Sequence, residues 1–478
     1  MLFNSVEFAF FLPIVFLLYW FVVPKNAAAR NIYIIIISYI FYGWWDWRFL
    51  SLIMLSSIVD YRLGIALGEE TRTRNRKFLL TTSIVVNIGI LAIFKYNNFF
   101  VENFAAVFTL LGQELNIRTL RIVLPVGISF YTFQTLSYSI DVYRRKIEHT
   151  RDVYAFFAFV SFFPQLVAGP IERATSLLPQ FYKAQTFNYS RAVDGMRQIL
   201  WGLFKKVVIA DRCAPFVDQI FANDYMYGGS TLLFGAVLFV LQIYGDFSGY
   251  SDIAIGTARL FGFKLRQNFA YPYFSRDIAE FWRRWHISLS TWFRDYLYIP
   301  LGGSSGGTWR KIRNTFIIFT VSGFWHGAGW NFVAWGALHA VYITPLMLMN
   351  RNRKNLEIIN PNGLLPGLTE VRQILTTFLL HSLALVVFRA RDLTNAYSML
   401  KRIFSASLFF PPIYINRSII VLVFIMLAVE WVQRDRPFGL DIGYLNLPRV
   451  VNWAIYYAVV ITILYFGSSQ ETFFYFQF

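Results

Sequence analysis

Charged side chains are scarce in this sequence. Only 15% of its 478 residues are Asp, Glu, Lys or Arg, whereas soluble domains typically carry about 25%. Hydrophobic residues make up 56% of the chain and aromatic residues 19%, and the mean hydropathy is +0.46. This composition excludes an ordinary soluble domain and predicts an all-α polytopic membrane protein.

Cysteine is almost missing, because Cys213 is the single one in the chain. An intramolecular disulfide and a thiolate metal cluster are therefore impossible, and we expect Cys213 to be a packed, inert side chain. The sequence has no HExxH motif, no G-x-S-x-G elbow and no P-loop, since "GGSSGG" (302–307) lacks the following GK[ST] and predicts a turn. We expect neither a metal nor a resident cofactor.

Long apolar runs recur along the whole chain. Crossing a hydrocarbon core takes roughly 20 helical residues, and we predict about eleven spans of this kind. The first run lacks a basic start, so we expect a retained helix and not a signal peptide. Residues 1–478 are therefore expected to form one integral-membrane domain. The runs lie near 3–23, 31–46, 49–67, 79–95, 121–140, 153–169, 231–247, 330–349, 374–388, 419–433 and 450–467.

Basic residues give the chain a net charge of +17, and they lie between the apolar runs. The positive-inside rule produces this distribution, so we expect contact with membrane lipids and no nucleic-acid binding. Up to residue 152, loops rich in Lys and Arg alternate with loops that contain few of them. We therefore expect the N-terminus on the periplasmic side. Beyond that point "FFPQLVAGPIERATSLLPQF" (162–181) predicts broken, re-entrant or interfacial helices, because irregular backbone at membrane depth must be buried or line a wet cavity.

His326 stands out among the five histidines, within "VSGFWHGAGW" (321–330). Its glycines permit close backbone approach, and Phe324, Trp325 and Trp330 exclude water. Burial disfavours the charged imidazolium, so the ring is expected to stay neutral and to accept a proton as a general base. The alternative is a hydrogen-bonded core histidine between two helices. By contrast, His149 and His381 are expected to be structural.

The segment "EFWRRWHISLSTWFRDYLYIPLGG" (280–303) carries His286 next to Arg283 and Arg284. Apolar residues recur in it at spacings of three and four, which predicts an amphipathic helix along the membrane interface. We expect the two arginines either to bind lipid phosphates or to attract an anionic, phosphorylated donor.

A polar insertion, "LQIYGDFSGYSDIAIG" (241–256), places Asp246 and Asp252 inside an apolar run. Carboxylates at membrane depth need partners. These two either line a cavity and orient a catalytic group, or they form a buried ion pair with arginine. The residues alone leave both interpretations open.

Taken in order, several segments resemble the membrane-bound O-acyltransferase (MBOAT) family, and within it the alginate O-acetyltransferase-like bacterial branch. The resemblance spans nearly the whole chain. It implies a ring of helices around a central funnel, with His326 at its middle and His286 nearer the cytoplasmic mouth. The matching segments are "MLFNSVEFAFFLPI", "LPVGISFYTFQTLSYSIDVYR", "FFPQLVAGPIER", "YGDFSGYSDIAIG", "FWRRWHISLSTWFRDYLYIPLGG", "GFWHGAGWNFVAWGALHA" and "YFQF".

The resemblance implies an acetyltransferase of the cell inner membrane. It would pass acetyl from acetyl-CoA to a hydroxyl, for O-acetylation of an exported polysaccharide such as alginate or peptidoglycan, together with a separate periplasmic acetyltransferase or acceptor protein. His326 would be the base, and His286 or Asn331 would stabilise the oxyanion. The catalytic candidates are His326 and His286, and the substrate-binding candidates are Arg283, Arg284, Trp325, Asn331, Asp246 and Asp252.

Two other functions stay open at this point. The related MBOAT branch transfers D-alanine to teichoic acids and would load from a carrier protein instead of CoA. A glycan transporter without chemistry would also explain the helices and the buried carboxylates. The transporter predicts that His326 can be replaced without loss of transport.

Overall fold

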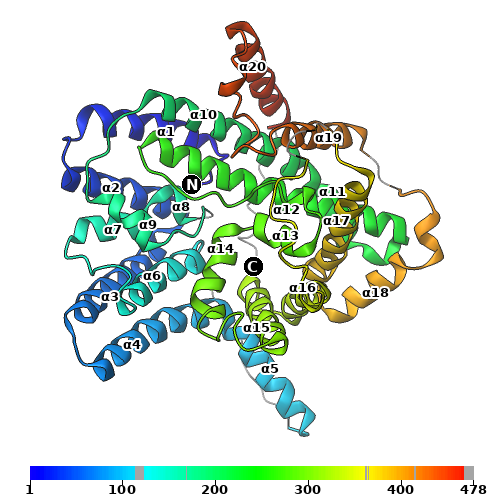
Figure 1. Cartoon of the computed structure of the whole chain (residues 1–478), viewed down its shortest axis with the longest axis horizontal. Coiled ribbons are helices and arrows are strands. Elements are labelled where there is room, and N and C mark those ends of the chain that lie inside the picture. The colour runs from blue at the N-terminus through cyan, green and yellow to red at the C-terminus, as the bar shows by residue number, and fades with distance from the viewer. Residues whose placement is uncertain (114–122, 168, 361–362, 364, 414–415, 468–478) are drawn as a thin grey trace. The chain divides into compact units, whose positions relative to one another are not determined.

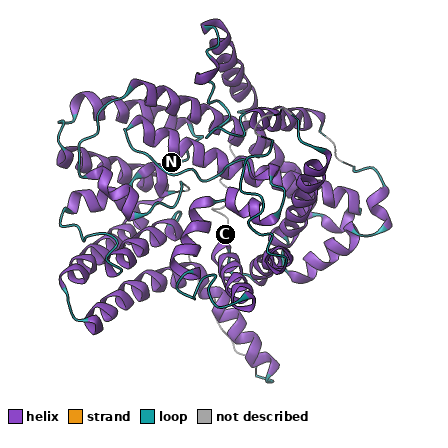
Figure 2. Cartoon of the chain, viewed as in Figure 1, coloured by secondary structure: helices purple, strands orange, loops and turns teal. Residues whose placement is uncertain are grey.

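Helices form all the regular structure in the described part of the chain, which a computed structural model gives for residues 1–113, 123–167, 169–360, 363, 365–413 and 416–467. Figure 2 shows helices joined by loops, with no strand among these residues. The prediction of an all-α protein is confirmed. Figure 1 shows these helices along the chain.

The chain divides into two compact units. Unit 1 comprises residues 1–192 and 258–265, and unit 2 comprises residues 193–257 together with the described residues after 265. α12 (Gly229–Leu260) begins in unit 2 and contributes its last residues to unit 1. The expected single domain over residues 1–478 stays a prediction.

Unit 1 contains a buried network of polar side chains from three of its helices. The buried carboxylate of Asp60 accepts hydrogen bonds from Ser83, Asn87 and Ser139 at 2.5, 2.7 and 2.7 Å. These donors compensate for the lost hydration of the carboxylate. The helices of unit 1 are α1 (Val6–Leu17), α2 (Ala27–Asp46), α3 (Leu50–Glu69), α4 (Thr73–Leu91), α5 (Asn97–Leu110), α6 (Ile128–Tyr143), α7 (Val153–Ser161), α8 (Phe163–Leu166) and α9 (Ala174–Leu177).

The segment 162–181, where prolines predict interrupted helices, contains α8 and α9, which have four residues each. The described side chains between Phe162 and Leu166 are buried in unit 1. The irregular backbone is therefore enclosed by protein, as polar peptide groups in an apolar environment require.

Unit 2 contains the longer helices of the second half of the chain. α10 (Tyr189–Leu203) enters it from unit 1 and continues as a π-helical segment, Phe204–Ala210. Besides α12, its helices are α11 (Asp211–Ala222), α13 (Ile278–Arg284), α14 (Ile287–Phe293), α15 (Thr308–His326), α16 (Trp330–Leu348), α17 (Leu368–Arg389), α18 (Leu393–Ile403), α19 (Arg417–Val432) and α20 (Arg449–Phe466).

Six helical stretches in the described part are long and apolar enough to cross a membrane. The first of them joins α2 and α3, which have 20 residues each, through a 3₁₀ turn, so each is long enough to span by itself. The count of about eleven spans stays a prediction. The six stretches are Ala27–Glu69, Thr73–Leu110, Gly229–Leu260, Trp330–Leu348, Leu368–Arg389 and Arg449–Phe466, and Val6–Val22 is a shorter apolar helix.

α15 and α16 form a tightly packed antiparallel pair around the turn at Gly327 and Gly329. A Cβ atom at Gly323 would lie inside van der Waals contact of the Phe332 carbonyl oxygen, and one at Gly336 would meet the Phe319 carbonyl oxygen in the same way. Small residues let helix backbones approach this closely. The approach holds His326, the last residue of α15, against α16.

Replacing Gly336 by alanine is expected to lower the melting temperature of the detergent-solubilised protein. The added methyl group forces the two backbones apart, which costs about 1–3 kcal/mol. Fluorescence-detected size exclusion after heating measures the shift. Gly89→Ala in α4 is the matched control, because its Cβ meets nothing within 4 Å. Equal melting temperatures for Gly336→Ala and wild type would contradict the close packing.

Candidate active site

The imidazole of His326 is enclosed by aromatic rings. It is 3% exposed, and its ring centroid lies 5.2 Å from that of Trp335 and 5.7 Å from that of Phe388, both in edge-to-face geometry. Gly327 ends α15 directly after it. These rings enclose the imidazole in an apolar environment.

His286 lies at a break between α13 and α14. Trp285 has extended backbone angles and His286 has φ +43°, in the left-handed region. The prediction of one continuous amphipathic helix over 280–303 is wrong at this point. The physical reason is Asn268, which precedes the segment in sequence. Its main-chain and side-chain oxygens accept hydrogen bonds from the first two backbone N–H groups of α14, at 2.9 and 3.2 Å, so a new helix can begin there.

Asn268 also orients the ring of His286. The side-chain oxygen of Asn268 lies 3.1 Å from Nδ1 of His286, and the amide nitrogen donates to the Ser251 hydroxyl at 3.1 Å. The Ser288 backbone N–H bonds the same oxygen, which identifies that atom as the acceptor. Nδ1 of His286 therefore carries the proton and Nε2 has the lone pair. The side chain of Asn268 therefore connects α12 to α14 through hydrogen bonds.

Burial lowers the pKa of His286 from its usual 6.5 to about 3, so the ring is neutral at physiological pH. Its Nε2 is buried and has no hydrogen-bond partner among the described residues. A neutral imidazole with this tautomer accepts a hydrogen bond or a proton at Nε2 and does not donate there.

Trp325 lies next to both imidazoles. Its ring centroid is 6.2 Å from that of His286 and 4.9 Å from that of His326. The structure thus brings together the two histidines that the sequence predicts as catalytic. His286 directly precedes α14 and His326 ends α15. Both histidines and Trp325 belong to unit 2.

Two further histidines, His339 and His381, belong to the same aromatic cluster. The ring of His339 lies 5.0 Å from Trp335 and 5.6 Å from His381. The Trp282 indole N–H donates to Nδ1 of His339 at 3.3 Å, which leaves the proton of the neutral ring on Nε2. Sequence reasoning assigned no role to His339. The sequence feature that could have pointed to His339 is its spacing of four residues from Trp335, which puts both side chains on one face of a helix.

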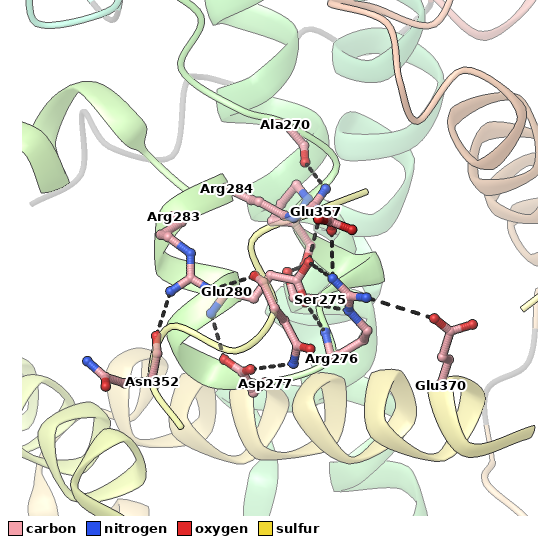
Figure 3. A network of polar contacts seen from close by, with 12 residues as sticks. Ala270, Ser275, Arg276, Asp277, Glu280, Arg283, Arg284, Asn352, Glu357 and Glu370 are labelled. Atoms are coloured by element: carbon pink, nitrogen blue, oxygen red, sulfur yellow. Dashed lines mark hydrogen bonds and ion pairs between the residues drawn. The ribbon is translucent and has the colours of Figure 1, made fainter. Parts of the chain in front are cut away.

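Arg283 and Arg284 are engaged within the protein, as Figure 3 shows. Arg283 donates to the carbonyl oxygens of Asn352 and Asn355 at 2.9 and 2.8 Å. Arg284 forms an ion pair with Glu280 at 2.8 Å. The two arginines therefore hold the end of α13 to its surroundings. Their predicted contact with lipid phosphate or with an anionic donor stays a prediction.

Asp246 and Asp252 form buried ion pairs with consecutive lysines of the π-helical segment. Lys206 lies 2.7 Å from Asp246 and 2.7 Å from Asp211, and Lys205 lies 2.6 Å from Asp252. The sequence left open a cavity role and a pair with arginine. The structure has the ion pairs, with lysine as the partner.

The same helix also orients a catalytic candidate, because Ser251, which holds Asn268, is the neighbour of Asp252. A small cavity of about 10 Å³ is lined by the Lys205–Asp252 pair and by Ser251 and Asn268, and its volume is about what one water needs. Ser248 and Tyr271 line it, and their hydroxyls have no partner among the described residues. The polar insertion in α12 therefore reaches His286 through Ser251 and Asn268.

Asn331 lies at the start of α16 and fixes the end of α17. Its amide nitrogen donates to the carbonyl oxygens of Phe388 and Ala390 at 3.2 and 3.0 Å. Both amide hydrogens are thereby engaged, and Phe388 is held beside His326. A role of Asn331 in substrate binding stays a prediction.

The comparison with protein families decides the class of the chain. A family model described as MBOAT, membrane-bound O-acyltransferase family, matches residues 40–388. The chain belongs to the MBOAT family. The matched range contains all the predicted catalytic and substrate-binding residues, together with Asn268 and His339. As an MBOAT protein, the chain is an O-acyltransferase of membranes.

Relatives of the chain are named for three different acceptors: alginate, peptidoglycan and teichoic acid. The chain is 40% identical to a probable alginate O-acetylase, AlgI, of Azotobacter vinelandii over 85% of this chain and 78% of the relative. It is 34% identical to a peptidoglycan O-acetyltransferase of Helicobacter pylori over 84% and 79%. Identity to a teichoic acid D-alanyltransferase of Bacillus subtilis is 30%, over 46% and 58%. The similarity to the two O-acetylating relatives extends over much more of the chain.

Substitution of Asn268 tests its role in orienting His286. We expect Asn268→Leu to lower O-acyl transfer about tenfold, because one hydrogen bond that fixes the tautomer is lost. Asn268→Asp keeps the acceptor, but its carboxylate favours the imidazolium and raises the pKa of His286. Transfer by Asn268→Asp should then decrease as the pH is lowered, because His286 becomes protonated. In the wild type, His286 stays neutral well below pH 6, so its protonation does not affect transfer.

The pH profile of transfer in isolated membranes, at matched protein levels, is the measurement. A merely structural role for Asn268 predicts less protein in both variants with an unchanged pH profile. Wild-type transfer by Asn268→Leu would contradict the proposed orientation of His286.

Proposed function

We propose that this protein transfers acetyl groups to hydroxyls of an exported polysaccharide. The observation that carries the proposal is the 40% identity over 85% of the chain to relatives named for alginate O-acetylation. A second relative, named for peptidoglycan O-acetylation, supports a glycan acceptor more generally. The buried neutral imidazoles of unit 2 provide groups suited to such a transfer.

In the proposed reaction, His326 is the general base. It takes the proton of the acceptor hydroxyl while that oxygen attacks the carbonyl carbon of an acetyl thioester, for which we propose acetyl-CoA. The tetrahedral intermediate then collapses, the carbon–sulfur bond breaks, and the leaving thiolate takes the proton from the imidazolium. The products are an O-acetyl ester and a free thiol, and His326 is again neutral. A base of this kind contributes about 10²–10⁴ in rate.

His286 serves this reaction as an acceptor. Its N–H is directed at Asn268, so it does not supply the N–H that a developing oxyanion needs. Its free Nε2 suits the orientation of a substrate hydroxyl. The indole N–H of Trp335 is a better oxyanion donor, because it is buried without a partner among the described residues and its ring contacts His326.

The cellular setting belongs to the same proposal. We propose that the protein lies in the inner membrane with its N-terminus on the periplasmic side, and that about eleven spans surround a central funnel. Acetyl would enter from cytoplasmic acetyl-CoA, and a separate periplasmic acetyltransferase or acceptor protein would pass it to the polysaccharide. The described helices contribute six apolar stretches to this arrangement.

The test follows labelled acetyl from acetyl-CoA into envelope material, in membranes that contain the natural partner proteins. We expect His326→Ala to lose about 10²-fold or more of the transfer, because the general base is gone. His149→Ala is the matched control, since His149 lies in unit 1 and outside the aromatic cluster. Protein levels of the variants are compared by immunoblot.

Each other result identifies a different function. Equal labelling by His326→Ala and wild type would show that His326 is a packed core ring and would overturn its catalytic role. Labelling from a D-alanyl carrier protein, with none from acetyl-CoA, would assign the chain to D-alanyl transfer. A lack of label from either donor, with glycan export intact, would favour a transporter.

A further inference from the structure

A cavity in unit 1 combines aromatic walls with two cationic side chains. Its volume is about 500 Å³. It lies outside the candidate active site, whose residues belong to unit 2. Its lining includes no carboxylate. The lining residues are Phe16, Trp20, Phe21, Lys25, Arg30, Ala184, Gln185, Thr186 and Phe187.

Arg30 is built into the wall of this cavity. It is 3% exposed, its guanidinium lies 4.8 Å from the ring centroids of Tyr19 and Trp20, and it donates to the Gln185 carbonyl oxygen. Its Nε is buried without a hydrogen-bond partner among the described residues. A buried cation without a carboxylate in the cavity wall favours an anionic ligand.

Lys25 adds a second, exposed positive charge at the cavity. It lies in the turn between the apolar helix Val6–Val22 and α2. The N-terminal end of α2, with its positive end of the helix dipole, begins two residues later. A turn at the end of a membrane helix lies at the level of lipid headgroups, and a tryptophan such as Trp20 at the cavity is typical of that level.

An apolar stripe runs from the cavity along α1. Its residues recur at spacings of three and four and therefore share one helix face. They have high exposure although they are large and hydrophobic, and the opposite face with Phe8, Phe11 and Val15 is buried. The exposed residues are Val6 at 63%, Phe10 at 68%, Ile14 at 57%, Leu17 at 53% and Phe21 at 79%.

We propose that this cavity and stripe form a binding site for one anionic phospholipid. The phosphate and the negatively charged headgroup occupy the cavity between Lys25 and Arg30, and an acyl chain lies along the apolar stripe of α1. Free phosphate shares the headgroup chemistry but has nothing to place on the stripe. The continuity of the charged cavity with the apolar face selects the lipid.

The experiment measures retention of phosphatidylglycerol by the full-length, detergent-solubilised protein in native mass spectrometry. Phosphatidylcholine with the same acyl chains serves as the zwitterionic comparison. We expect Lys25→Ala to weaken phosphatidylglycerol binding about fivefold, as loss of one headgroup-level lysine predicts, and Lys25→Arg to bind like wild type. Phosphatidylcholine should bind more weakly and be insensitive to Lys25→Ala.

Lys77→Ala is the matched control. Lys77 is an exposed lysine near the start of α4 in the same unit, so this variant removes the same charge away from the cavity, and we expect unchanged binding. Unchanged binding by Lys25→Ala would overturn the proposal, and so would an equal loss in Lys77→Ala, which indicates a bulk charge effect. Displacement of the lipid by millimolar inorganic phosphate would show a free anion site.

Discussion

The rest of unit 2 depends on the close approach of the backbones of α10 and α12. Buried ion pairs form beside this approach. Gly202 of α10 and Gly249 of α12 face each other, and a Cβ on either would meet the carbonyl oxygen of the other inside van der Waals contact. This approach lets Lys205 and Lys206 reach carboxylates on α12 at 2.6 and 2.7 Å. Removal of one partner from a buried ion pair costs several kcal/mol, about 3–5 by typical measurements, so these pairs fix the two helices relative to each other.

That fixed helix is also where the orientation of the catalytic candidates begins. Asn268 donates to Ser251 of α12, accepts a hydrogen bond from a backbone N–H at the start of α14, and engages Nδ1 of His286. The polar residues of α12 thus contact Asn268 and the two lysines. Hydrogen bonds connect Ser251, the sequence neighbour of Asp252, through Asn268 to His286.

The aromatic cluster encloses both candidate catalytic histidines. His286 and His326 are held among indole and phenyl rings from several helices, with Trp325 in contact with both. Burial disfavours charge on His286, so its Nε2 presents a lone pair at neutral pH. In the proposed reaction, the same burial strengthens the hydrogen bond that Trp335 donates to the developing negative charge.

The sequence by itself determined the all-α membrane architecture and singled out His326 as a candidate, because hydropathy over 20 residues and a histidine among glycines and tryptophans are local properties. It indicated His286 through its neighbours, but predicted a continuous helix there. Only the tertiary structure decided the helix break, the lysine partners of Asp246 and Asp252, and the role of Asn268. Those features depend on hydrogen bonds and ion pairs between residues far apart in the chain, and no local spacing encodes such contacts.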